Sequence, residues 1–158
     1  MKELNTIGLD QEKAENLAKK LNTLLSNYSI FYQNTRGFHW NIQGDKFFEL
    51  HLKFEEIYND LLLKIDEIAE RILTLGYTPE HRYTEYSKSS TIKESDKVMD
   101  GHTAVAQILD SLKIVIVMQR AILELANDAN DEGTNALISY YIRFQEKQIW
   151  MYSSFLNK

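Results

Sequence analysis

Apolar residues recur every three or four positions through four long stretches of this chain, and no other feature constrains its fold as strongly. The stretches cover about residues 10–44, 45–75, 100–127 and 131–156. The chain has one proline in 158 residues, so little interrupts a helix once it has begun. Asp10 is a suitable N-cap for the first stretch, and Gly76 with Pro79 ends the second. The sequence therefore predicts an all-α protein with four long helices.

The connections between these helices predict how they are arranged. Helices of this length extend about 40 Å at ~1.5 Å per residue, and short turns join the first pair and the last pair, which should each form an antiparallel hairpin. Residues 77–99 are too many for a tight turn, and the capping-box sequence from Thr91 to Glu94 predicts one short helix that begins there. We expect a ferritin-like four-helix bundle with a long crossover, containing a short helix, between helices two and three.

Composition and charge limit the other possibilities. The length suits one domain covering residues 1–158, with residues 1–9 as a short N-terminal extension. The chain has no cysteine, so any metal must be held by histidine and carboxylate side chains. It shows no signal-peptide core, and its longest apolar run, residues 114–118, is too short to span a bilayer, so we expect a soluble, cytoplasmic protein with no membrane partner. A net charge of −5 and the lack of a polybasic arm predict weak or absent DNA binding.

A set of metal-binding residue types lies on the second predicted helix. His51, Glu55, Asp66 and Glu70 share one face of it, but His51 and Asp66 are about 22 Å apart along a straight helix, too far for one metal site. If the same helix of a second subunit packs antiparallel across a two-fold axis, the His51 end of one chain lies beside the Asp66 end of the other. His39, just across a short turn, can reach the same place as His51. We expect two sites per dimer, each built from His39, His51 and Glu55 of one chain with Asp66 and Glu70 of its partner.

The chemistry of this ligand set points to iron. Two imidazoles with two or three carboxylates and no thiolate suit ferrous iron, and zinc can compete for the same ligands. The Glu-x-x-His motif of di-iron sites inside a single bundle occurs nowhere in the chain, which favours a site between subunits.

Each residue of the set also has an ordinary structural interpretation when it is taken alone. His39 could be a core histidine, and His51 could be an interface residue. Glu55 could pair with a nearby lysine, while Asp66 and Glu70 could be a solvated pair on an acidic helix. The joint spacing of the four main ligands favours metal binding over these separate interpretations.

Short motifs around these residues give a resemblance to a known family. The motifs are Phe38-His39-Trp40-Asn41, then His51, then Asp66-Glu67-Ile68-Ala69-Glu70-Arg71, with Asp131-Glu132-Gly133-Thr134 and Glu146, Lys147, Trp150 and Met151 further on. Together they resemble the Dps (DNA-protection-during-starvation) family of ferritin-like proteins, over about residues 10–156. In that pattern His39, His51, Asp66 and Glu70 match the ferroxidase residues.

The resemblance implies a function and an assembly. It implies a hollow dodecamer, built from two-fold dimers, that oxidises iron(II) with hydrogen peroxide in preference to oxygen and stores ferric oxide inside. Trp40 matches a tryptophan beside the site that can intercept radicals. Asp128, Asp131 and Glu132 match acidic residues that line three-fold pores for iron entry, although helix capping also explains acids at a helix start. Ala136 departs from the pattern, because relatives often have another acidic pore residue there.

Two other functions are consistent with the same fold. One is a DNA-binding shell that protects the nucleoid and for which iron chemistry is secondary. The acidic charge balance disfavours it. The other is a structural shell or adhesin-like coat that has kept the fold and lost turnover. A measurement of the rate of iron oxidation would distinguish a ferroxidase, which oxidises iron rapidly, from a structural coat.

Overall fold

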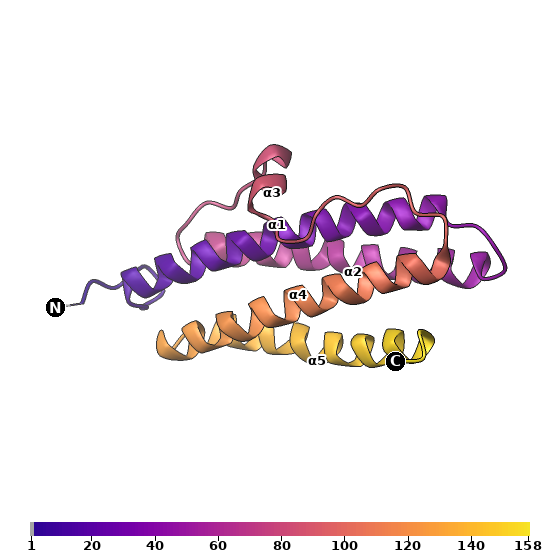
Figure 1. Ribbon diagram of the computed structural model, residues 1–158. Helices are drawn as coiled ribbons and strands as arrows, with labels where there is room; N and C mark the ends of the chain where they lie inside the picture. Colours follow the sequence, from indigo (N-terminus) through magenta and orange to yellow (C-terminus); the bar gives the residue numbers. More distant parts are fainter. Residues whose placement is uncertain (1) are drawn as a thin grey trace.

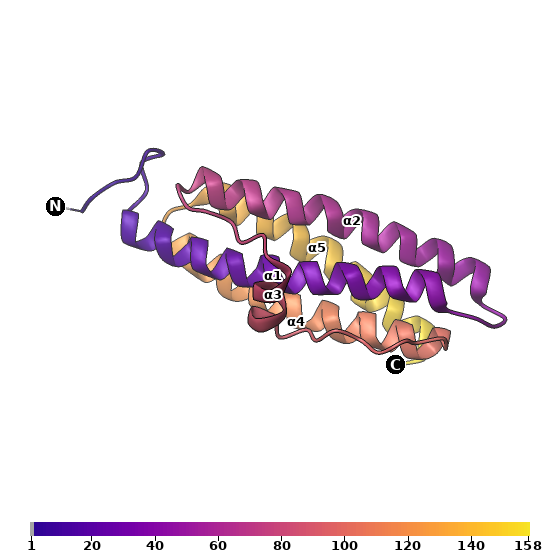
Figure 2. The same cartoon turned by 90° about the horizontal axis from the view of Figure 1, so that it is seen from above.

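The computed structural model describes residues 2–158 and consists of five helices. They are α1 (Gln11–Asn41), α2 (Phe47–Thr74), α3 (Tyr83–Ser89), α4 (Gly101–Asp128) and α5 (Glu132–Phe155). The four long helices lie side by side as two hairpins, α1 with α2 and α4 with α5 (Figure 1; Figure 2). This confirms the predicted all-α bundle with a long crossover between its second and third long helices.

Three aspartates fix where the long helices begin. The carboxylate of Asp10 accepts a hydrogen bond from the Lys13 amide at 3.0 Å, as predicted for the start of α1. Asp100 caps α4 and Asp131 caps α5 in the same way. Each cap satisfies an amide that no helical carbonyl can reach, so the sequence itself sets the starting points. Within residues 2–158, none of the helices has the length and apolar character that crossing a membrane would require.

The short helix of the crossover lies elsewhere than predicted. It spans Tyr83–Ser89 and ends before the capping-box sequence that begins at Thr91. The amides of Thr91 and Ile92 both donate to the side-chain oxygen of Asn27 at 3.0 Å, and residues 91–99 form no helix. The prediction of a helix starting at Thr91 was therefore wrong. In a capping box the Thr91 amide would donate to the Glu94 side chain, and here it donates to Asn27 of α1 instead.

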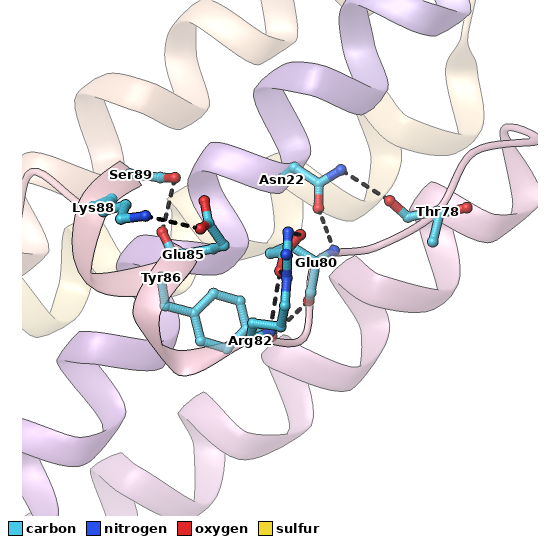
Figure 3. Close-up of polar contacts among 8 residues, drawn as sticks. All are labelled: Asn22, Thr78, Glu80, Arg82, Glu85, Tyr86, Lys88 and Ser89. Atoms are coloured by element: carbon cyan, nitrogen blue, oxygen red, sulfur yellow. Dashed lines mark hydrogen bonds and ion pairs between the residues drawn. The ribbon is translucent and has the colours of Figure 1, made fainter.

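Three asparagines of α1 hold the crossover along the length of the bundle. Asn22 donates to the Thr78 carbonyl at 3.2 Å and accepts from the Glu80 amide at 2.8 Å (Figure 3). Asn34 likewise donates to the Lys93 carbonyl and accepts from the Ser95 amide, both at 2.9 Å. Asn27, fully buried between them, accepts from two amides and from a serine hydroxyl. Side-chain amides can donate and accept at once, which makes them good partners for irregular backbone.

The start of the crossover carries a local ion pair. Arg82 donates to the Glu80 carboxylate at 2.6 Å, and the Tyr86 hydroxyl donates to the Glu80 carbonyl at 2.7 Å (Figure 3). The hydrogen bond from Arg82 lowers the pKa of Glu80 to about 2. The pair is solvent-exposed, so it orders the turn into α3 and adds little to stability.

We predict that Asn27→Ala destabilises the protein by on the order of 3 kcal/mol, because the buried or partly buried amides of Thr91 and Ile92 lose their acceptor. Thermal unfolding at one fixed protein concentration measures the effect, since association also adds to stability. Asn41→Ala, at an exposed position at the end of α1, is the matched control. Equal melting temperatures for the two variants would contradict this role of Asn27.

Candidate metal centre

The structure brings His39 and His51 into direct contact. His39 lies near the end of α1 and His51 lies in the first turns of α2, and residues 42–46 connect the two helices. Their rings stack with centroids 3.8 Å apart and planes 10° from parallel. The spacing argument therefore placed the two imidazoles correctly.

Two reciprocal hydrogen bonds show which ring nitrogen of each imidazole carries a hydrogen. The Nδ1 atom of His39 lies 2.6 Å from the His51 carbonyl oxygen, and Nδ1 of His51 lies 2.7 Å from the His39 carbonyl oxygen. A carbonyl oxygen can only accept, so each Nδ1 carries the hydrogen. In the neutral ring the lone pair is then on Nε2, which is the arrangement that a metal-binding histidine needs.

Neighbouring aromatic rings hold the histidine pair in place. Phe47 stacks on His51 with centroids 4.9 Å apart, and the Tyr58 ring meets His39 edge-on at 5.3 Å. Tyr58 was not predicted from the sequence. It lies seven residues after His51, two turns along the same face of α2, and that spacing was the available signal. Trp40, by contrast, is exposed and lies under the Arg36 guanidinium.

The carboxylates divide into two groups along α2. Glu55 is partly buried one turn after His51, whereas Asp66 and Glu70 are exposed towards the other end of the helix. Within the described residues, none of the three forms an ion pair, and no three histidine or acidic side chains come close enough together to hold a metal ion. One chain thus presents an imidazole pair and a separate carboxylate pair.

Polar side chains that bond to one another occupy the centre of the bundle. Tyr28, Gln119 and Gln145 form a buried, closed ring of hydrogen bonds of 2.5–2.6 Å. Beside it, the buried ammonium of Lys64 contacts Asp60 at 2.5 Å and lies over the Tyr141 ring. Burial raises the pKa of Tyr28 and keeps its phenol protonated. Neutral amides, a protonated phenol and the Lys64–Asp60 ion pair occupy this space, so a metal site inside one bundle is disfavoured.

The three acidic residues expected at a pore lie at the turn between α4 and α5, and they differ in exposure and in ion pairing. Asp131 is 2% exposed, accepts from Arg71 at 2.7 Å, and caps α5 through the Thr134 amide. This placement does not support a pore role for Asp131, and we assign it to capping and to anchoring Arg71. Glu132 is exposed. Asp128 is exposed as well but pairs with Lys13 at 2.8 Å, which lowers the pKa of Asp128.

Gly133 makes the Arg71 contact possible. A Cβ atom at this position would lie 2.8 Å from the guanidinium nitrogens of Arg71. The glycine therefore leaves the space through which Arg71 reaches Asp131 and Thr134.

We predict that Asp131→Ala costs about 3–5 kcal/mol of stability, because it leaves the Arg71 guanidinium without its partner and α5 without its cap. Glu132→Ala, one residue away and exposed, should change stability by less than about 0.5 kcal/mol. Thermal unfolding of both variants measures the difference. A small loss for Asp131→Ala would contradict this assignment and leave the pore role that the family resemblance implies.

Comparison with known proteins agrees with the fold. A family model described as a ferritin-like domain matches residues 18–158. The crystal structure of a Dps protein from Vibrio cholerae, described as a member of a broad superfamily of ferritin-like diiron-carboxylate proteins, superposes with a TM-score of 0.95. It is 55% identical in sequence, over 97% of this chain and 96% of that one.

Two proteins are similar in sequence to this chain over nearly the whole length of both proteins. A DNA protection during starvation protein of Porphyromonas gingivalis is 41% identical over 98% of each chain. An uncharacterized protein of Haemophilus influenzae is 52% identical over 94% of this chain and 93% of its own length. These matches, together with the fold, show that the chain belongs to the Dps family of ferritin-like proteins.

Proposed function

We propose that this chain is a ferroxidase subunit that oxidises Fe(II), preferably with hydrogen peroxide, and stores ferric oxide in a hollow shell as protection against oxidative stress. The observation that carries the proposal is the imidazole pair, whose hydrogen bonds leave both Nε2 lone pairs for a metal. Family membership and the diiron-carboxylate description of the Vibrio cholerae protein support it. The preference for peroxide over oxygen rests on the family resemblance.

A two-fold dimer would complete the site. A second α2, packed antiparallel, would set the Asp66 and Glu70 carboxylates of one chain opposite the imidazole pair of the other. Leu62 lies close to the midpoint between His51 and Glu70, where the axis would cross α2. Leu62 and Leu63 are 49% and 66% exposed, and a partner helix would bury such side chains. We propose a dodecamer made of these dimers.

The residues would divide the chemical work between them. Neutral imidazoles and carboxylates suit Fe(II), and the carboxylates favour the harder Fe(III) product, while zinc would compete for the same ligands. Two Fe(II) ions at one site supply together the two electrons that convert peroxide to water, so no hydroxyl radical is released. Glu132 and Asp128, exposed at the α4–α5 turn, are the proposed residues for iron entry.

Mixing two inactive variants tests whether the site is shared. We predict that His39→Ala with His51→Ala, and Asp66→Ala with Glu70→Ala, each abolish rapid Fe(II) oxidation. In shells co-assembled from equal amounts, half of the dimers are mixed and each has one intact site of two, so about a quarter of the wild-type rate should return. Stopped-flow absorbance after addition of Fe(II) and peroxide measures the rate, and light scattering checks assembly.

The controls separate the site assignment from the rival functions. Each variant measured alone must assemble to the wild-type mass. Mixed shells without any recovered activity would show that the two residue sets do not meet across a dimer axis. Assembled wild-type shells that oxidise Fe(II) only at the background rate would instead favour a structural coat.

A DNA-binding shell is the alternative function. The similarity to the DNA protection during starvation protein of Porphyromonas gingivalis favours it. The net charge of −5 opposes it, since affinity for DNA comes largely from neutralising phosphates with basic residues. We predict no retardation of linear DNA in a gel at about 0.15 M salt. The same mixture at low salt is the control for weak contacts. A clear shift at 0.15 M salt that fades as salt rises would establish the alternative.

A further inference from the structure

We propose that Arg36 is the counter-charge of the shared site. In the metal-free dimer its guanidinium pairs with the Asp66 and Glu70 carboxylates of the partner subunit, and a divalent metal ion displaces it when it binds them. The inference rests on the proposed function, because it needs the two-fold dimer of that proposal. It adds a positioning residue, outside the ligand set, that sets how tightly metal is held.

Arg36 lies on α1 beside the imidazole pair. It precedes His39 by three residues, so the two side chains lie on the same side of the helix. Its guanidinium carbon lies 4.8 Å from the ring centroid of Trp40, the residue that follows His39, and 5.5 Å from that of Tyr32. The two rings hold the guanidinium in place, but a neutral ring cannot cancel its charge.

The guanidinium is also on the face that a second subunit would cover. Arg36 and Trp40 line an open groove that Leu62 and Ile65 of α2 line as well. Leu62 is 49% exposed and lies close to the proposed two-fold axis. A partner helix that buries Leu62 would therefore reach the groove and take water away from Arg36.

Within residues 2–158, Arg36 has no carboxylate partner. Its one side-chain hydrogen bond goes to the Gln33 side-chain oxygen and is long, at 3.4 Å. Glu94 and Asp96 line the same groove, yet neither forms an ion pair with Arg36. Arg36 is already partly buried, and a charge that loses more water without gaining an opposite charge is costly. The covered groove thus calls for an acid from the partner.

The partner subunit would bring two acids to this place. Asp66 and Glu70 are exposed, form no ion pair within the described part of the chain, and lie one turn apart, where like charges repel. Antiparallel pairing of two α2 helices sets them opposite His39 and His51, whose neutral rings supply no charge. A guanidinium has five N–H donors and can pair with both carboxylates at once.

Metal and guanidinium would compete for the same carboxylate oxygens. Without metal, the guanidinium compensates the two acids and strengthens the association of the subunits. With metal, the same pairing lowers the apparent affinity, because only the unpaired fraction of the site can bind. Loss of Arg36 should therefore weaken the metal-free assembly and tighten metal binding. A purely structural role would weaken both.

Cobalt(II) binding to the metal-free assembly tests this competition. Co(II) takes nitrogen and oxygen ligands and absorbs visible light when bound. We predict that Arg36→Gln binds Co(II) about tenfold more tightly than wild type, the size of one charge-assisted hydrogen bond. Light scattering in increasing urea should show that the metal-free variant dissociates at a lower urea concentration than wild type, and that Co(II) removes this difference. Arg36→Lys should lie between the two proteins in both measurements.

A double-mutant cycle connects the effect to the partner's acids. In a background of Asp66→Asn with Glu70→Gln, Arg36→Gln should not change the urea midpoint of the metal-free assembly any further. Additive effects would contradict the pairing. Arg143→Gln is the matched control, because this arginine is exposed on α5 and forms no ion pair within residues 2–158. It should leave Co(II) affinity and assembly at wild-type values.

The outcomes separate this inference from the proposed function. Equal or weaker Co(II) binding by Arg36→Gln overturns the inference, and so does a variant that fails to assemble even with Co(II). The shared site stands in either case if Asp66→Asn with Glu70→Gln abolishes Co(II) binding. If that double variant binds Co(II) as wild type does, the shared site fails and both proposals fall with it.

Discussion

The length of helix between His51 and Asp66 is the constraint on which the rest of the structure depends. α2 is continuous from Phe47 to Thr74, so these residues stay about 22 Å apart at ~1.5 Å per residue. No side-chain movement closes that distance within one chain. The imidazole pair and the Asp66–Glu70 pair therefore lie at separate places on one chain. A function that needs both pairs in one site would require a second copy of the chain.

The bundle interior reinforces this division. The space at its centre, where ferritin-like di-iron proteins direct their carboxylates inward, contains neutral amides, phenols and the Lys64 ammonium. Within residues 2–158, every buried side-chain nitrogen and oxygen atom has a hydrogen-bond partner. The residues proposed as metal ligands lie outside this space, on α2 and near the end of α1.

Local pattern predicted much of the molecule, and long-range hydrogen bonds account for most of what it missed. Helical periodicity and the Asp10 cap predicted the long helices, and the His39 and His51 spacing predicted their contact. The position of the short helix was missed because Asn27, more than sixty residues away in sequence, takes the Thr91 and Ile92 amides. Asp131 was expected to line an iron-entry pore for a similar reason, since nothing in the sequence shows that Arg71 reaches it.

Arg71 also gives the two ends of the proposed iron path a rigid connection. It follows Glu70 directly, and its guanidinium bonds Asp131 and Thr134 at the start of α5. The carboxylate end of α2 is therefore fixed relative to the turn that carries Glu132. Arg71 compensates the charge of the buried Asp131, and Lys13 pairs with Asp128. The exposed negative charge at this turn therefore comes mainly from Glu132. A cation attracted to the turn would thus meet the Glu132 carboxylate. The Arg71–Asp131 ion pair, for which Gly133 leaves the space, fixes how far that carboxylate lies from Glu70.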